Sequence, residues 1–178
     1  NQLKREGVNS YYKNNYESAL YCFENVLEVN GQPVFAGEFD TVGTHWNGKP
    51  VRYYVEPKWK NSAAEIFKHT PEMLTLFSDL LGVPYPWQKY DQIVVRDYVS
   101  GAMENTSAVV HGTSVYRDAR ALADYNSEDV IAHELFHQWF GDLVTCKTWG
   151  DLTLNEGFAS FGEYLWHDHK YGADDVNY

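Results

Sequence analysis

The segment His133-Glu134-Leu135-Phe136-His137 contains two histidines four positions apart, with a glutamate directly after the first. On an α-helix, side chains four positions apart project from the same face, so both imidazoles can bind one tetrahedral ion. Glu134 points beside such an ion, which suits a carboxylate that accepts a proton from water at the metal. The segment therefore predicts a helix with two zinc ligands and a general base.

A third ligand is predicted at Glu156, which is separated from His137 by eighteen residues. A second helix that begins at this glutamate could bring its carboxylate to the same ion. Two histidines and one glutamate leave the fourth coordination position open, which distinguishes catalytic zinc sites from structural ones. We therefore expect His133, His137 and Glu156 to bind one catalytic zinc ion.

The residues around the histidine segment also favour a helix. Asn126 or Ser127 can cap its N-terminus, and the acidic Glu128 and Asp129 suit the first turn, where the helix dipole favours anions. Gly141 can end the helix in a left-handed conformation. Apolar residues surround the helix on nearly all sides, which predicts that it is buried. A buried glutamate at position 134 is costly unless it has a function.

A second motif, GAMEN at residues 101–105, follows the strand-like segment 92–99. A glycine at its start lets another backbone approach closely, and an edge strand here could pair with an extended peptide. Glu104 presents a negative charge to a cationic group such as a free peptide N-terminus. From the residues alone, Glu104 could equally be an ordinary loop carboxylate.

With these motifs the chain resembles the M1 family of zinc aminopeptidases, within the gluzincins. The similarity rests on the motif at 101–105, the histidine segment 133–137 and Glu156 at the family's spacing. It extends from about Val34 to the C-terminus. It implies an enzyme that removes single residues from peptides with a free N-terminus.

The resemblance also implies a role for each matching residue. His133, His137 and Glu156 would bind one zinc ion, and Glu134 would be the general base. Glu104 would bind the α-ammonium group of the substrate, and Gly101 and Ala102 would contact its backbone.

The chain departs from the family pattern in two places. Thr106-Ser107 stands where many members carry Trp-Gly. The family also has an oxyanion-stabilising tyrosine several dozen residues beyond the third ligand, and Tyr164 and Tyr171 are too close to Glu156 to match it. We therefore expect the chain to be a fragment with reduced or no activity alone.

The remaining pattern predicts an α+β fold, which the resemblance identifies as a partial thermolysin-like zinc peptidase domain over residues 34–178. The sheet and the helices would form two walls of a cleft. Ser62 and Glu65 suggest a capping box, and Leu80 is expected to face inward from a helix that starts at Thr70. The expected strands are 34–40, 51–56, 92–99 and 108–115, with a turn at 46–50.

Residues 1–30 show a different pattern. Gly7, Tyr16, Ala19 and Phe23 lie at the spacings of a tetratricopeptide repeat, with 26–30 at the end of its second helix. One repeat cannot bury its own apolar face. We therefore expect a helical hairpin that packs against or binds a protein partner. An amphipathic hairpin without repeat ancestry is the alternative.

The amino-acid composition of the chain limits the classes of partner that it can bind. The chain is 44% hydrophobic and 16% aromatic, enough for a folded core, and its net charge of −11 opposes binding to nucleic acid or anionic membranes. No apolar run is long enough to span a bilayer. Cys22 and Cys146 cannot define a disulfide framework, and unbridged buried thiols are the favoured interpretation.

Three functional hypotheses follow. The leading one is a zinc aminopeptidase or a part of one. The second is a zinc-binding interaction module derived from such an enzyme that no longer catalyses. The third is a thermolysin-type endopeptidase, which Glu104 argues against because it would select a free amine.

Overall fold

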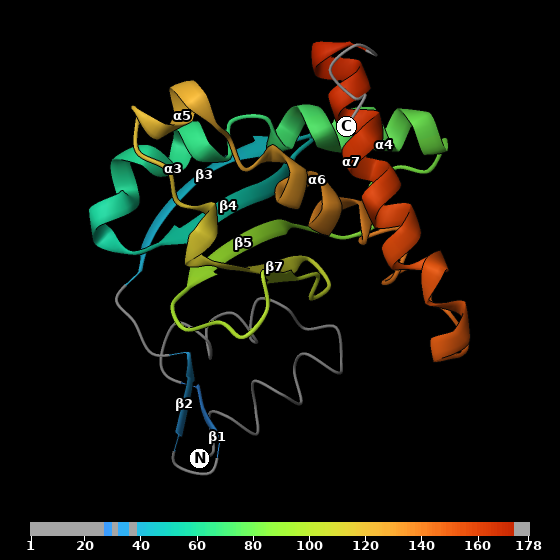
Figure 1. Ribbon diagram of the computed structural model, residues 1–178, viewed down its shortest axis with the longest axis horizontal. Coiled ribbons are helices and arrows are strands. Elements are labelled where there is room, and N and C mark those ends of the chain that lie inside the picture. The colour runs from blue at the N-terminus through green and yellow to red at the C-terminus, as the bar shows by residue number, and fades with distance from the viewer. Residues whose placement is uncertain (1–26, 30–31, 36–38, 173–178) are drawn as a thin grey trace.

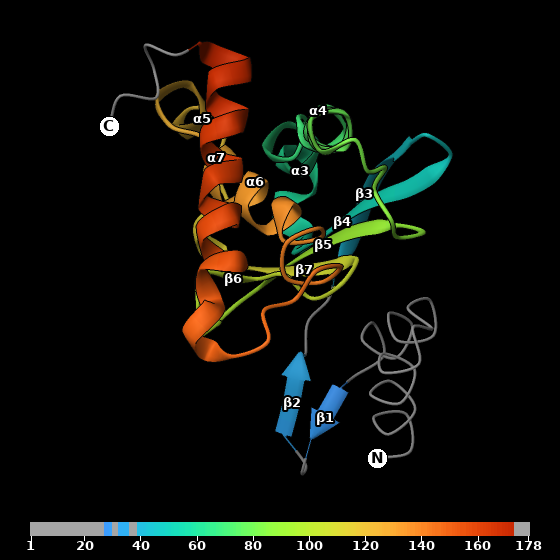
Figure 2. The same cartoon turned by 90° about the vertical axis from the view of Figure 1, so that its right-hand side faces the viewer.

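The computed structural model describes residues 27–29, 32–35 and 39–172, with side chains from residue 39 onward. These residues form a mixed α and β structure in which helices pack on one face of a five-stranded sheet (Figures 1 and 2). Most of the predicted N-terminal hairpin lies outside the described residues. A mixed fold agrees with the α+β prediction.

The five-stranded sheet has the order β3-β4-β5-β7-β6. Its three central strands run parallel to one another, and each edge strand runs antiparallel to its neighbour. A separate antiparallel ribbon consists of β1 and β2. The strands are β1 (Leu27–Val29), β2 (Gln32–Phe35), β3 (Asp40–Trp46), β4 (Lys49–Val55), β5 (Tyr90–Val95), β6 (Ala102–Met103) and β7 (Ala108–Gly112).

Helices follow the strands and cover the sheet. The connection from β4 to the parallel β5 runs through α3 and α4, and the C-terminal part of the chain is helical. The helices are α3 (Lys60–Ile66), α4 (Thr70–Leu81), α5 (Ala121–Asp124), α6 (Glu128–Phe136) and α7 (Glu156–Tyr171), with short 3-10 helices at Pro57–Trp59, Thr113–Val115 and Trp149–Leu154.

Several predicted elements are confirmed. β3 and β4 meet at the two-residue turn Asn47-Gly48, whose positive φ angles of 47° and 77° suit a hairpin between twisted strands. The helix α4 begins at Thr70 with a proline in its first turn, and it ends at Gly82 with a φ of 63°. The strands at 51–56 and 108–115 also form, the second as the shorter β7.

The segment 92–99 differs from the prediction. Its strand, β5, spans Tyr90–Val95 and lies between β4 and β7, so it is not an edge strand. The extended conformation ends because Asp97 adopts a positive φ of 52°, which a strand cannot accommodate. The edge is formed by β6, which lies within the motif at 101–105.

Four local predictions in the N-terminal half of the chain are wrong. Leu27–Val29, placed at a helix end, forms strand β1, and the strand expected at 34–40 is divided between β2 and β3. The helix α3 begins at Lys60 without a side-chain cap, because a 3-10 turn that starts at Pro57 leads directly into it. Leu80 is 55% exposed at the last turn of α4.

The main core lies between the sheet and the helices. Tyr53 of β4 and Tyr90 and Val94 of β5 face it from the sheet. From the helices, the ring of Phe77 packs edge-on against Phe136 at 4.8 Å between centroids. The helix α6 is therefore buried on most sides, as predicted, and its orientation is fixed by close packing.

The crossing of α6 and α7 depends on a glycine. A Cβ atom added at Gly162 would lie 2.6 to 2.9 Å from three side-chain atoms of Phe136. The two helices therefore approach closely only because position 162 has no side chain.

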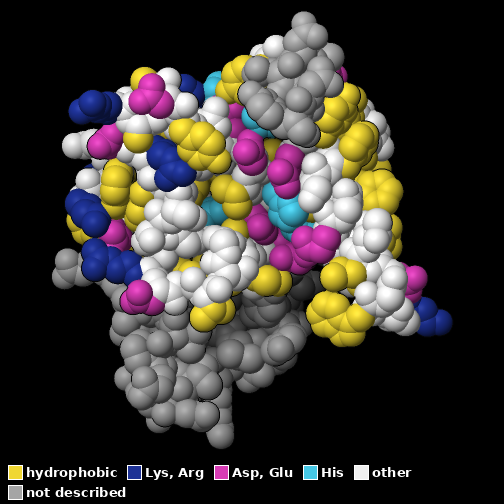
Figure 3. Space-filling view, viewed as in Figure 1, with side chains coloured by type: hydrophobic (Ala, Val, Ile, Leu, Met, Phe, Trp, Pro, Cys, Tyr) yellow, Lys and Arg dark blue, Asp and Glu magenta, His cyan; other side chains and the backbone are white. Residues whose placement is uncertain are grey.

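Charged side chains are unevenly distributed over the surface. On the face shown in Figure 3, acidic side chains lie beside histidines near the centre, and most Lys and Arg side chains lie toward the left edge. This separation places negative potential around the histidines at the centre of this face.

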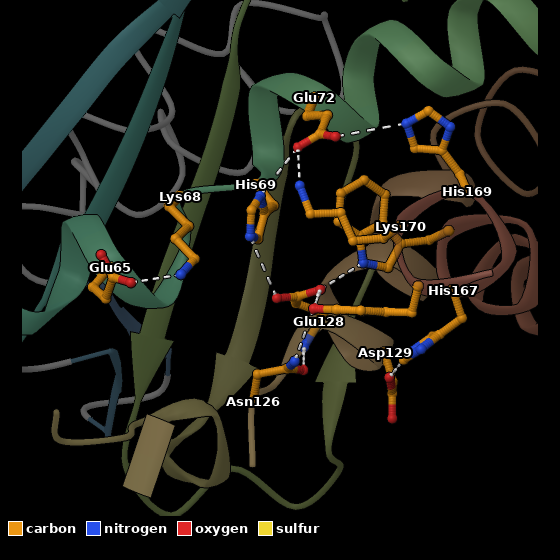
Figure 4. Close-up of polar contacts among 12 residues, drawn as sticks. Glu65, Lys68, His69, Glu72, Asn126, Glu128, Asp129, His167, His169 and Lys170 are labelled. Atoms are coloured by element: carbon orange, nitrogen blue, oxygen red, sulfur yellow. Dashed lines mark hydrogen bonds and ion pairs between the residues drawn. The ribbon is translucent and has the colours of Figure 1, made fainter. Parts of the chain in front are cut away.

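A polar cluster around the buried Glu128 ties α7 to α6 and α4 (Figure 4). Glu128, at the start of α6, is 4% exposed and accepts hydrogen bonds from Trp166 Nε1 at 2.7 Å and from Tyr171 Oη at 2.8 Å. Lys170 donates to Glu72 of α4 at 2.7 Å. The C-terminal half of α7 is thus held from two sides.

Two expectations about the chain as a whole can be compared with these residues. Within the described ranges, no helix is both long and apolar enough to cross a bilayer. Cys146 is half-buried and unbridged there, and Cys22 lies outside the described residues.

His111 on β7 gives a testable pH dependence. It is fully buried against Gln92, and burial lowers its pKa from 6.5 to about 3. The unfolded chain therefore binds a proton below pH 6.5 that the folded chain does not, so stability is lost as the pH falls from 6.5 toward 3. At pH 5.5 we expect this residue alone to lower the free energy of unfolding by about 1.4 kcal/mol.

The measurement is urea unfolding of wild type and His111→Gln at pH 7.5 and 5.5. The variant should be less stable at pH 7.5, because the new side chain packs less well, but its decline toward pH 5.5 should be shallower. Equal declines in the two proteins would show that His111 is not the group responsible.

Candidate metal and substrate site

His133 and His137 lie together at the C-terminal end of α6. Their Nε2 atoms are 3.2 Å apart, because four positions correspond to about one helical turn. His137 is the helix C-cap, and its side chain is 1% exposed. The structure thus brings the two predicted ligands together.

Glu156 reaches both histidines from the first turn of α7. Its Oε2 lies 3.2 Å from His133 Nε2 and 3.5 Å from His137 Nε2. Ligand atoms bound at about 2.0–2.1 Å to a tetrahedral zinc ion are separated by roughly 3.3 Å. Three donor atoms of the types that zinc prefers therefore already have the required spacing, and the residues fit the ion.

The outer nitrogens of both imidazoles are engaged elsewhere. His133 Nδ1 contacts Glu163 Oε1 at 2.6 Å, and His137 Nδ1 contacts the carbonyl oxygen of Phe140 at 2.9 Å. These contacts leave Nε2 of each ring for an ion and fix the orientation of each ring. Burial lowers the pKa of His133, but its hydrogen bond to Glu163 and the nearby carboxylates outweigh burial, so the pKa is raised.

Glu163 was not identified from the sequence. It lies seven residues after Glu156, two turns further along the same face of α7, and that spacing was the available signal. Its partner His133 is thirty residues away in the chain, so the pair exists only after α6 and α7 pack.

We expect Glu163→Gln to weaken zinc binding about 10- to 100-fold, because the ring of His133 loses its carboxylate partner. Competition with a chromophoric chelator measures the affinity. Asp168→Asn is the matched control, since it removes one negative charge from an exposed position on the same helix. An equal loss of affinity in both variants would mean that only net charge matters.

Glu134 lies beside the histidine pair. It is 6% exposed, and its Oε2 has no hydrogen-bond partner among the described residues. Burial raises its pKa to about 8; His133 opposes this rise, and Glu104 adds to it. A buried carboxylate with one unpaired oxygen is suited to proton transfer, and a nearby cation would favour its charged form.

Glu104 approaches the same place from the sheet. Its carboxylate, that of Glu134 and a ring nitrogen of His137 all lie within 4.8 Å of one another. These three residues are a second possible ligand group, but they share His137 with the first. The first group offers two imidazoles, which are good zinc donors, and is therefore the better candidate for a metal site.

The motif around Glu104 leaves room for a peptide backbone. A Cβ atom added at Gly101 would meet nothing within 4 Å, and Ala102 begins the edge strand β6. Among the described strands, β6 pairs with β7 alone. Its other edge is the position where an extended peptide would add.

The electrostatics of the site favour cations. Burial, with a smaller contribution from the nearby Glu104, raises the pKa of Asp142 to about 7. Burial, followed by the charges of Glu134 and Glu104, also raises the pKa of Tyr98. Several carboxylates close together suit a metal ion and an ammonium group.

Comparisons with known proteins agree on one family. The protein-family model described as "Peptidase family M1 domain" matches residues 65–178 of this chain. Glutamyl aminopeptidases are similar to the chain: the protein from Sus scrofa is 41% identical and that from Homo sapiens 39% identical, each over 137 residues, 74% of this chain and 14% of the relative. Aminopeptidase M1-B from Oryza sativa subsp. japonica is 38% identical over 142 residues, 74% of this chain and 16% of that protein.

The chain thus spans 14% of the length of the first relatives that it matches. The family match covers most of the chain, including the motif at 101–105, the segment 133–137 and Glu156. The chain belongs to peptidase family M1.

Proposed function

We propose that the chain carries the metal-binding, proton-transfer and amine-binding residues of a zinc aminopeptidase, on part of a thermolysin-like domain. The observation that supports this most is the convergence of His133, His137 and Glu156 from two helices, with a spacing of 3.2 to 3.5 Å between their donor atoms. Glutamyl aminopeptidases among the relatives favour the same activity.

In this proposal, His133, His137 and Glu156 hold one zinc ion. When bound, zinc would polarise the scissile carbonyl and make a nearby water more acidic. Glu134 accepts a proton from the attacking water on its unpaired Oε2 and passes it to the leaving amine nitrogen. The low exposure of Glu134 keeps bulk water from competing for this proton.

Glu104 would bind the α-ammonium group of the substrate, and Gly101 and Ala102 would contact its backbone along β6. The carboxylate of Glu104 lies within 4.8 Å of Glu134 and His137, so the amine and the reacting carbonyl would be held a short distance apart. A peptide bound by its free end then presents only its first peptide bond to the base and the ion.

Because the chain covers 14% to 16% of these relatives, we propose that turnover by these 178 residues alone is slow. A partner that binds residues 1–30 stays a prediction, since residues 1–26 lie outside the described part of the structure.

The decisive experiment measures zinc content and hydrolysis on the same preparation. The substrates are aminoacyl p-nitroanilides with several first residues, including glutamyl because the relatives carry that name, together with their N-acetylated forms. We expect one zinc ion per chain and hydrolysis that stops when the amine is acetylated.

Each alternative predicts a different result. Zinc without hydrolysis of any substrate would favour the non-catalytic module. Cleavage of an internally quenched peptide with a blocked N-terminus would favour an endopeptidase. A preparation that binds no zinc would contradict the proposal at its first step.

A further inference from the structure

We propose that Gln138 is a positioning residue that holds Glu104 at a fixed distance from the histidine pair, and so sets how far a substrate's amine lies from its reacting carbonyl. This inference rests on the proposed function and concerns a residue with no role in metal binding or proton transfer.

Gln138 follows His137 directly and is fully buried. Its side chain forms hydrogen bonds with the loop at residues 104–107 at two points. Its Nε2 donates to the backbone oxygen of Glu104 at 2.8 Å, and its Oε1 accepts from the backbone nitrogen of Ser107 at 2.7 Å. One side chain therefore connects the end of α6 with both ends of the 104–107 segment.

The backbone of Gln138 is held as well. Its carbonyl oxygen accepts a hydrogen bond from Trp87 Nε1 at 3.2 Å. The side-chain amide and the backbone carbonyl of Gln138 are both bonded, and the residue is not exposed to water. Gln138 can therefore transmit the position of α6 to the 104–107 segment.

The backbone conformation of Ser107 depends on its hydrogen bond to Gln138. The turn from Asn105 to Ala108 is closed by a 2.8 Å backbone hydrogen bond, and Ser107 at its third position has a φ of 61°. Glycine is favoured in that position because other residues are strained there. A strained residue keeps its conformation only when its surroundings hold it.

The other side of Ser107 is fixed by β5. Its carbonyl oxygen accepts from Lys89 Nζ at 3.1 Å and from the backbone nitrogen of Asp91 at 2.9 Å. Lys89 also bonds to Asp91, which is paired with Arg52 at 2.8 Å. The sheet therefore holds the oxygen of Ser107, and Gln138 holds its nitrogen.

The consequence is that α6 and the sheet together fix the loop. If Gln138 lost its side-chain bonds, the metal ligands and Glu134 would keep their places on α6, whereas the turn at Ser107 could relax and Glu104 would move. Recognition of the amine should then fail while the metal site stays intact.

The test measures binding to the zinc-loaded chain by calorimetry. Leucine hydroxamate binds the metal and carries an α-amine, and 4-methylpentanohydroxamate is the same molecule without that amine. The ratio of their dissociation constants reports the contact with Glu104. We expect wild type to prefer the amine by about 10- to 100-fold, the range for a charge-assisted hydrogen bond.

In Gln138→Met we expect the preference to fall to about threefold or less, with zinc content and affinity for the amine-free compound unchanged within about twofold. Gln138→Asn, one methylene shorter, can keep one of the two bonds and should give an intermediate ratio. If the Met variant does not fold, the ratio in the Asn variant decides.

Two further variants separate positioning from general destabilisation. Gln92→Met removes a second glutamine that is fully buried and bonded at both ends, to Thr70 and His111, and should keep the wild-type ratio. Ser107→Gly fits the turn without strain and removes a hydroxyl that has no partner among the described residues. Added to Gln138→Met, it should restore part of the preference.

The outcomes are distinct. A wild-type ratio in Gln138→Met with normal zinc content would overturn the positioning role, as would an equal loss in Gln92→Met. No amine preference in the wild type would instead contradict the role of Glu104 in the proposed function.

Discussion

Replacing Glu134 by glutamine should nearly abolish peptide hydrolysis without removing the metal. Glutamine has almost the same shape, but its amide cannot accept a proton from water or pass one to the leaving amine. The loss expected for a missing general base is roughly 10²- to 10⁴-fold. Glu134 is also 6% exposed, so bulk water has little access to replace it.

The measurement is kcat/KM on the best free-amine substrate, with zinc content measured on the same sample. Glu104→Gln is the informative comparison. It should raise KM for free-amine substrates, because the ammonium group loses its charged partner, while the proton-transfer step keeps its base. A Glu134→Gln protein that retains more than about a tenth of wild-type activity would mean that another group is the base.

Gly162→Ala should weaken both the fold and the metal site. Alanine is intrinsically better than glycine in a helix by about 1 kcal/mol, so a stability gain would be expected if space allowed. The added Cβ would instead meet three side-chain atoms of Phe136 at 2.6 to 2.9 Å. The ring of Phe136 packs against Phe77 and is 1% exposed, so it has little room to move.

We therefore expect a net loss of about 1–3 kcal/mol in the free energy of unfolding. Because Glu156 lies on α7 and the histidines on α6, separation of the helices should also lower zinc affinity. Urea unfolding and chelator competition measure the two effects. Gly150→Ala is the control, since its nearest neighbour would be Thr148 Oγ1 at 3.5 Å.

A substitution at Phe136 tests the same helix contact from the other side. Phe136→Leu creates space at the same contact, so its combination with Gly162→Ala should be less destabilised than the sum of the single variants. Strict additivity would show that the two positions do not contact each other as described.

The parts of the site that depend on local geometry could be predicted from the sequence. His133 and His137 are one helical turn apart, and α7 begins at Glu156 as expected. Glu163 and Gln138 were not predicted, because their partners lie about thirty residues away in the chain. Such pairs depend on how elements pack, which residue spacing does not encode.

The strand boundaries predicted at 92–99 were wrong for a related reason. The apolar and β-branched pattern of 92–99 predicts a strand, and β5 forms there, but the positive φ of Asp97 ends the extended segment. Its position inside the sheet follows from pairing with β4 and β7 on either side. The metal ligands at 133, 137 and 156 remain a prediction that the geometry supports.

Because the three proposed ligands come from two helices, zinc would act as a removable cross-link in the folded chain. An ion bound only by the folded state adds about 1.4 kcal/mol to its stability for each tenfold rise in free zinc above the dissociation constant. We expect zinc scarcity to increase the unfolded fraction and expose it to degradation. The abundance of the protein, as well as its activity, would then follow the zinc supply of its surroundings.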